Sequence, residues 1–174
     1  MQIQALLERP EFIGQVAALI HNQWPYEFEG ISLQTWSEEF QTLEGFGRTT
    51  FVAVEGSRLL GTACLDIEDL PQRPELGPWL ASVYVMPEAR SQGLGSQLVK
   101  AVEREAWKQG VSRLHLHTTD RESFYAEHGW KTLEHLQAWN KNVALMCKEM
   151  PNEIPDEIPE DTHAQTYVEQ PNVG

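Results

Sequence analysis

The chain has 174 residues, of which 41% are hydrophobic, so it is long enough to form one domain with a single core. Its formal net charge of −13 argues against nucleic acid as a partner, because phosphate binding requires a basic surface. No stretch approaches the roughly 20 apolar residues of a membrane span, and charges interrupt the N-terminal segment where a signal peptide would be apolar. We therefore expect a cytoplasmic protein that does not contact a membrane.

The first half of the chain alternates between strand-like and helix-like segments. Apolar residues recur every three or four positions in the helical segments, as in the sets Phe12, Val16, Leu19, Ile20 and Leu33, Trp36, Phe40, Leu43. Gly56-Ser57 predicts a hairpin turn. The segments expected in chain order are a strand at 3–7, helices at 9–24 and 32–43, strands at 48–56 and 58–69, and, after a loop, a strand at 79–86.

The second half continues the mixture without an internal linker or repeat. It predicts a helix at 94–109 that Gly110 ends, a strand at 111–118, a short helix up to His128, and strands at 130–139 and 142–150. Helices and strands therefore mix in one α+β domain that spans residues 1–150.

Residues 151–174 differ from the rest in composition. They hold six acidic residues, four prolines and no lysine or arginine, and we expect a disordered tail because their apolar residues are too sparse to offset the entropy of ordering. The remaining chain has 20 acidic and 13 basic residues. An acidic body suits an amine-bearing substrate, although solubility explains it equally well.

The two cysteines give no sign of redox or metal chemistry. Cys64 and Cys147 lie in apolar strand-like runs without C-x-x-C spacing. We expect both to be buried and structural, with no metal site in the protein.

The corner between the strand at 79–86 and the helix at 94–109 carries two glycines. Its sequence, residues 85–99, is VMPEARSQGLGSQLV, which lacks both the lysine of a P-loop and the third glycine of a dinucleotide-binding fingerprint. The free N–H groups of a helix start, together with the helix dipole, bind anions. The corner is either such an anion site or an ordinary tight turn with Arg90 on the surface.

Two motifs resemble the GCN5-related N-acetyltransferase (GNAT) family. Arg90-x-x-Gly93-x-Gly95, after Val-Met-Pro, is similar to its pyrophosphate loop, and SFYAEHGW at 123–130 is similar to its F-Y-x-x-x-G-F element, with Trp130 in place of Phe. The order of elements also matches over residues 1–150. The resemblance implies a GNAT fold: a mixed, mostly antiparallel, twisted sheet of six to seven strands flanked by about four helices.

The resemblance also implies acetyl-CoA as the cofactor. In this family the strand before the loop bulges away from its neighbour, so that backbone groups near Val83 and Val85 would pair with pantetheine and the acetyl carbonyl. The pyrophosphate would be held by Arg90 and by the backbone amides of Gln92, Gly93, Leu94, Gly95 and Ser96.

Tyr125 matches the family tyrosine that gives a proton to the coenzyme A sulfur. Residues 119–122 have the pattern of a capping box, which would place Tyr125 in the second turn of a short helix. The alternative is a buried tyrosine whose hydroxyl merely finds one partner.

His117 is the candidate base that would take the proton from the amine. Strand alternation puts it on the same side as His115, and the fourth position of the matching L-x-L-[EH] string carries the base in some relatives. Histidine has a suitable pKa for this role at neutral pH. Four carboxylates remain alternatives: Glu27, Glu29, Asp66 and Asp120.

The acceptor side would be formed, by the same resemblance, by the first helices, the loop after them and the final hairpin. These supply Trp24, Tyr26, Glu27 and Glu29, with Trp139, an aromatic and acidic set that favours a cation. A weaker similarity to protein amino-terminal acetyltransferases leaves both small amines and peptide amino termini open. We expect an acetyl-CoA-dependent N-acetyltransferase, monomeric or homodimeric, that transfers acetyl directly in a ternary complex; the alternative is a non-catalytic acyl-CoA-binding module.

Overall fold

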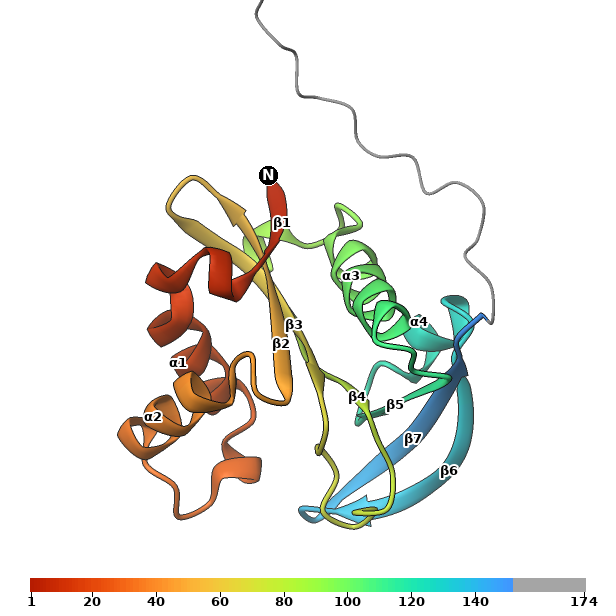
Figure 1. Ribbon diagram of the computed structural model, residues 1–174. Helices are drawn as coiled ribbons and strands as arrows, with labels where there is room; N and C mark the ends of the chain where they lie inside the picture. The colour runs from red at the N-terminus through yellow and green to blue at the C-terminus, as the bar shows by residue number, and fades with distance from the viewer. Residues whose placement is uncertain (152–174) are drawn as a thin grey trace, which may run out of the picture.

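The computed structural model describes residues 1–151 as one seven-stranded sheet with helices on both faces (Figure 1). The predicted tail at 151–174 lies, apart from Pro151, outside the described residues. Four α-helices and seven strands confirm the predicted α+β fold class. The elements are β1 (Gln2–Ala5), η1 (Leu6–Glu8), η2 (Pro10–Phe12), α1 (Ile13–Gln23), η3 (Pro25–Phe28), α2 (Leu33–Leu43), β2 (Arg48–Glu55), β3 (Arg58–Asp66), β4 (Trp79–Val85), η4 (Pro87–Ala89), α3 (Leu94–Lys108), β5 (Arg113–Thr118), α4 (Glu122–Glu127), β6 (Lys131–Ala138) and β7 (Lys141–Glu149).

The strand order is β1-β2-β3-β4-β5-β7-β6, and every neighbouring pair is antiparallel except β4 and β5. These two central strands run parallel and pair only where Trp79 lies opposite His115. Beyond that point they separate, and the sheet opens in its middle (Figure 1).

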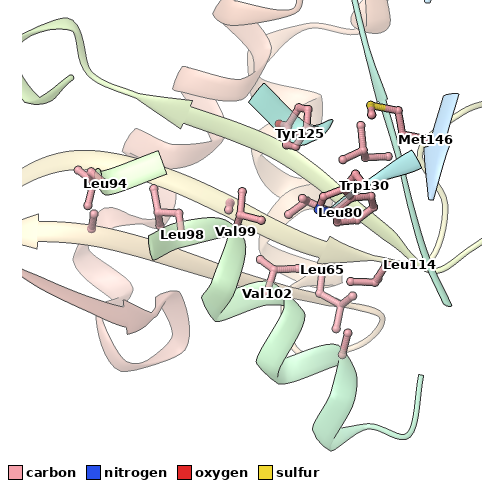
Figure 2. Packing of buried hydrophobic residues seen from close by; sticks show 14 of the residues in the cluster. Leu65, Leu80, Leu94, Leu98, Val99, Val102, Leu114, Tyr125, Trp130 and Met146 are labelled. Atoms are coloured by element: carbon pink, nitrogen blue, oxygen red, sulfur yellow. The ribbon is translucent and has the colours of Figure 1, made fainter. Parts of the chain in front are cut away.

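The two faces of the sheet carry different helices (Figure 1). Alternation along β2 sends Val52 and Val54 toward α1 and α2, and Ala53 toward α3. On the α3 face, Leu94, Leu98, Val99 and Val102 belong to one buried cluster with Leu65, Leu80 and Leu114 (Figure 2). The amphipathic pattern of α3 thus fixes its rotation, and its first turn points into the opening between β4 and β5.

The structure corrects three local predictions, two about where a helix begins and one about a buried side chain. The predicted helix at 9–24 begins instead with 3-10 turns, and α1 starts only at Ile13. Leu33, expected on the buried stripe of α2, is 38% exposed because it is the first residue after the cap Ser32, whose hydroxyl accepts from Thr35 N. The expected capping box at 119–122 is absent, since Thr118 Oγ1 accepts from Arg121 N at 3.0 Å instead.

Both cysteines are buried and unpaired, as expected. None of the helices in the described part of the chain is long and apolar enough to cross a bilayer.

Gly61 shows how tightly β3 lies against the irregular part of β4. A Cβ at this position would come within 2.7 Å of Tyr84 O and 3.0 Å of Leu98 Cδ1, whereas a Cβ at Gly14 of α1 would meet nothing within 4 Å. Backbone atoms of a paired strand cannot yield as a flexible side chain can.

We therefore expect Gly61→Ala to lower the free energy of unfolding by about 1–3 kcal/mol, as other overpacked cores do. Gly14→Ala, the matched control, should leave it unchanged or raise it by up to about 1 kcal/mol, because alanine favours a helix. Urea unfolding of both variants measures the difference. Equal stabilities would contradict the close approach of β3 and β4.

Candidate active site

A cleft of about 530 Å³ lies where β4 leaves β5. One end is formed by the loop between β4 and α3, and the other end by η3, the loop after β3 and the last residues of β5. Segments that are distant in the sequence thus meet around the opening in the sheet (Figure 1).

The irregular part of β4 forms one wall of this cleft. Its register against β3 shifts between Thr62 and Cys64, which face Tyr84 and Ala81, and Ser82 has a φ of 52°. A bulge therefore sits at Ser82 and Val83 and bends the strand away from β5. Val83 and Val85 line the cleft, as predicted, and Val85 O accepts a 2.9 Å hydrogen bond from Arg90 Nε.

The glycine-containing corner forms the end of the cleft at the start of α3. Gly93 is the N-cap residue, with φ 73°, and no side chain caps the helix. A non-glycine residue would be strained there, and the first N–H groups of α3 are left for water or an anion. At Gly95 an added Cβ would make only ordinary contacts, 3.6 Å from Phe124 Cζ and 3.7 Å from Val85 Cγ2, so the fold itself does not require this glycine. A corner whose first helical amides have no side-chain cap fits an anionic group of a cofactor.

Most of the residues predicted to bind the pyrophosphate lie at this end. Arg90, Gly93, Leu94, Gly95 and Ser96 line the cleft, and the guanidinium of Arg90 stacks on Tyr84 at 5.5 Å from the ring centroid. Within residues 1–151, no hydrogen bond or ion pair occupies its terminal nitrogens. Gln92 is exposed and does not line the cleft, because the turn before Gly93 directs it outward.

Tyr125 lies in the wall of the cleft between its two ends. Its ring is buried against Phe124 and Trp130, with centroids 5.1 and 6.2 Å away. Its hydroxyl makes no hydrogen bond among the described residues, although the residue lines the cleft. Burial, reinforced by the charge of Asp120, raises the pKa of Tyr125 well above its ordinary value, so the phenol keeps its proton.

His117 lies at the other end, in an acidic setting. Its Nε2 is 2.9 Å from Asp69 Oδ2, and both side chains are largely buried. The contact is an ion pair when the imidazole is protonated, and Nε2 makes no hydrogen bond among the described residues. Burial lowers the pKa of His117, but Asp69 and Glu27 outweigh it, and the pKa is raised above its ordinary value.

Glu27 completes this acidic end. Burial, and then the charge of Asp69, raise its pKa to about 7, while His117 and Arg48 oppose that rise. Glu27 therefore changes charge near neutral pH, and its titration is coupled to that of His117.

The other acceptor-side predictions divide between the cleft and its surroundings. Trp24, Tyr26 and Asp120 line the cleft, and Trp139 packs on Tyr26 and on His117, with centroids 5.8 and 5.3 Å away. Glu29 is exposed outside the cleft, because the 3-10 turn directs Phe28 inward against Trp36.

Two aspartates on and after β3 have different surroundings. Asp66 forms a buried ion pair with Arg48 and does not line the cleft. Asp69, which the sequence analysis overlooked, contacts His117. Asp69 lies in a loop and is distant from His117 in sequence, so no local pattern pointed to the pair.

The comparisons with known proteins agree with this geometry. The model of the acetyltransferase (GNAT) family matches residues 13–130. The chain belongs to this family. The predicted resemblance is thereby confirmed, and members of the family take their acetyl group from acetyl-CoA.

A relative from Bos taurus, thialysine N-epsilon-acetyltransferase, is 32% identical over 111 residues, which cover 54% of this chain and 62% of the relative. The match thus spans less than two thirds of that protein. The crystal structure of aminoglycoside 6'-acetyltransferase type Ii is similar with a TM-score of 0.68 and 24% identity, over 88% of this chain and 100% of that one. Spermidine N-acetyltransferase from Vibrio cholerae, solved with CoA and spermine, gives 0.64 and 17%, over 86% and 95%. These two structures support the fold.

The glycine corner generates a binding prediction. Gly95→Val should weaken coenzyme A binding at least about tenfold in calorimetry, since a branched side chain beside Phe124 and Val85 would crowd the backbone that the anion must approach. Its melting temperature should stay close to that of Gly14→Val, a control at a surface helix position. Unchanged affinity would exclude the corner as the anion site.

Proposed function

We propose that this protein transfers the acetyl group of acetyl-CoA to a primary amine. The amine attacks the thioester directly within a ternary complex of protein, acetyl-CoA and amine. The observation that carries the proposal is the cleft itself. It is lined by the uncapped first turn of α3, by Tyr125 and by the pair of His117 and Asp69. Acetyl-CoA supplies the acetyl group as an activated thioester.

The cofactor end uses groups that need no rearrangement. The first N–H groups of α3 and the terminal nitrogens of Arg90 are donors for a pyrophosphate, and the bulged segment of β4 offers backbone groups to a pantetheine amide. Arg90 already bonds Val85 O, so one side chain would link the two parts of the cofactor site.

His117 is the proposed base for the amine. An alkylammonium is not a nucleophile, so a proton must leave before attack. His117 can take it directly or through water, and Asp69 stabilises the imidazolium that results. Glu27 adds to that stabilisation and is the alternative base, because burial raises its own pKa to about 7.

Tyr125 is the proposed acid for the leaving sulfur. Its raised pKa keeps the phenol protonated over the working pH range, and its hydroxyl has no partner among residues 1–151 to compete for the proton. Neither cysteine lines the cleft, which supports direct transfer over an acetyl-enzyme.

The acceptor end favours a small amine with more than one positive charge. Glu27, Asp69 and Asp120 line it together with the aromatic rings of Trp24 and Tyr26, and carboxylates with aromatic faces attract cations. The names of the relatives, which refer to thialysine, an aminoglycoside and spermidine, point to the same chemical class. An acidic peptide terminus would be repelled. Cytoplasmic location and a monomeric or homodimeric state remain predictions.

Thiol release from acetyl-CoA with a panel of polyamines, aminoglycosides, lysine analogues and acidic peptides tests the proposal. We expect turnover with cationic amines and little with acidic peptides. Tight acetyl-CoA binding without turnover for any amine would instead favour the non-catalytic binding module.

Tyr125→Phe keeps the buried ring and removes the proposed proton donor. We expect kcat to fall about 10- to 1000-fold while acetyl-CoA affinity changes little, because the loss concerns only the chemical step. The matched control is Tyr84→Phe, which keeps the ring under Arg90 and lies in the same cleft. Equal loss in both variants would exclude a special role for the Tyr125 hydroxyl.

The pH profile of kcat/KM distinguishes the two candidate bases. If His117 is the base, activity should rise with pH as His117 loses its proton, and Glu27→Gln should move that rise to lower pH, because removal of the carboxylate lowers the pKa of His117. Glu27→Gln should keep the plateau of kcat/KM, whereas His117→Gln should lose that plateau. Deprotonation of the acceptor amine contributes equally to the pH profile of each variant. A shift between two profiles therefore reports on the protein's own groups. A collapsed plateau in Glu27→Gln with normal activity in His117→Gln would assign the base to Glu27.

A further inference from the structure

His128 lies behind the anion corner and contacts it through Ser96. It is the residue that follows α4, it is half-buried, and its ring stacks on Phe124 with centroids 4.5 Å apart. Nδ1 is 2.7 Å from Phe124 O, and Nε2 is 2.7 Å from Ser96 Oγ. Both ring nitrogens of this histidine are therefore engaged.

The two partners determine where the hydrogens lie. A carbonyl oxygen only accepts, so Nδ1 carries a hydrogen and donates it to Phe124 O. In a neutral ring Nε2 then has a lone pair and accepts the hydroxyl hydrogen of Ser96. In the imidazolium, Nε2 carries a hydrogen as well and donates it to Ser96 Oγ.

This choice matters because Ser96 lines the cleft in the first turn of α3. With neutral His128, the single hydroxyl hydrogen is directed away from an anion, and the oxygen would present lone pairs to it. With protonated His128, the hydroxyl is free to donate to a phosphate oxygen, and a positive charge stands directly behind it.

We propose that His128 takes up a proton when the pyrophosphate of acetyl-CoA binds at this corner, and that Ser96 links the imidazole to the phosphate through hydrogen bonds. The inference rests on the cofactor site proposed above and adds a pH-dependent positioning residue to it. Cofactor affinity should increase as the pH falls, over the range in which free His128 is neutral and bound His128 is charged.

Two acidic side chains on the elements around the imidazole have partners of their own. Glu103 pairs with Lys148 at 2.8 Å, and Glu122 bonds Thr132 and His135. Among the described residues, no charged side chain bonds the ring. The charged residues and histidines on the surrounding elements are Lys100, Glu103, Arg104, Glu105 and Lys108 on α3, Arg121, Glu122 and Glu127 at α4, Lys131, Glu134 and His135 on β6, and Lys141, Lys148 and Glu149 on β7.

Calorimetry in two buffers of different ionisation enthalpy measures the proton uptake. Dephospho-coenzyme A is the probe, because it keeps the pyrophosphate but lacks the phosphate monoester that itself titrates near pH 6. We expect uptake of up to about one proton per molecule bound. Nitrogen NMR of the histidine rings on saturation with the probe should show that His128 becomes the imidazolium.

Three variants test whether the proton uptake depends on Ser96 and His128 and not on another histidine. Ser96→Ala and His128→Gln should still bind the probe but lose the uptake and the pH dependence of affinity. His135→Gln, which alters an exposed histidine on β6, should keep both.

Binding by the wild-type protein without uptake, or uptake that persists in His128→Gln, would overturn this inference and leave the proposed function intact. Absence of any binding of the probe or of acetyl-CoA would instead refute the proposed cofactor site.

Discussion

The separation of β4 from β5 is the constraint on which the rest of the site depends. The two strands pair at Trp79 and His115, and the bulge at Ser82 and Val83 then turns β4 away. Two neighbouring parallel strands would otherwise close the centre of the sheet with hydrogen bonds. Because they separate, the backbone of β4, the first turn of α3 and the side chains of β5 and α4 meet in one cleft. Gly61 allows this by letting β3 follow β4 closely through the irregular region.

Electrostatics divide the cleft into two ends with opposite preferences. The first turn of α3 and Arg90 favour an anion, whereas Glu27 and Asp69 favour a cation. At the acidic end the charges of Glu27 and Asp69 are only partly neutralised by His117. Asp66, in contrast, is paired with buried Arg48, which also contacts the rings of Trp36 and Phe40. Two carboxylates three positions apart in the chain therefore differ in role, one structural and one facing the cleft.

Much of this arrangement could be predicted from local patterns. The periodicity of residues 94–109 gave the rotation of α3, and strand alternation correctly placed His115 and His117 on one side, where both rings pack on Trp79. The Arg90-x-x-Gly93-x-Gly95 and F-Y-x-x-x-G motifs, in their order along the chain, were sufficient for the family, because each motif lies within one short stretch of sequence. Helix starts were less predictable, since Thr118, the last residue of β5, accepts from Arg121 N before α4, and the capping box expected from Thr119 does not form.

Long-range pairs were beyond prediction. Asp69 and His117 meet because the loop after β3 folds over β5, and Ser96 and His128 meet because α4 packs beside the start of α3. Neither contact has a spacing that a single sequence reveals. The bulge at Ser82 was equally beyond prediction. It depends on how β4 pairs with β3 and on the loss of pairing with β5 beyond Trp79.

The central claim is that one cleft places an anionic cofactor at the glycine corner and its sulfur beside Tyr125. A crystal structure of the protein with coenzyme A tests it most directly. The account predicts the pyrophosphate on the amides at the start of α3 and the sulfur within hydrogen-bonding distance of Tyr125 Oη. A cofactor bound elsewhere, or one in the cleft with its sulfur directed away from Tyr125, would contradict it.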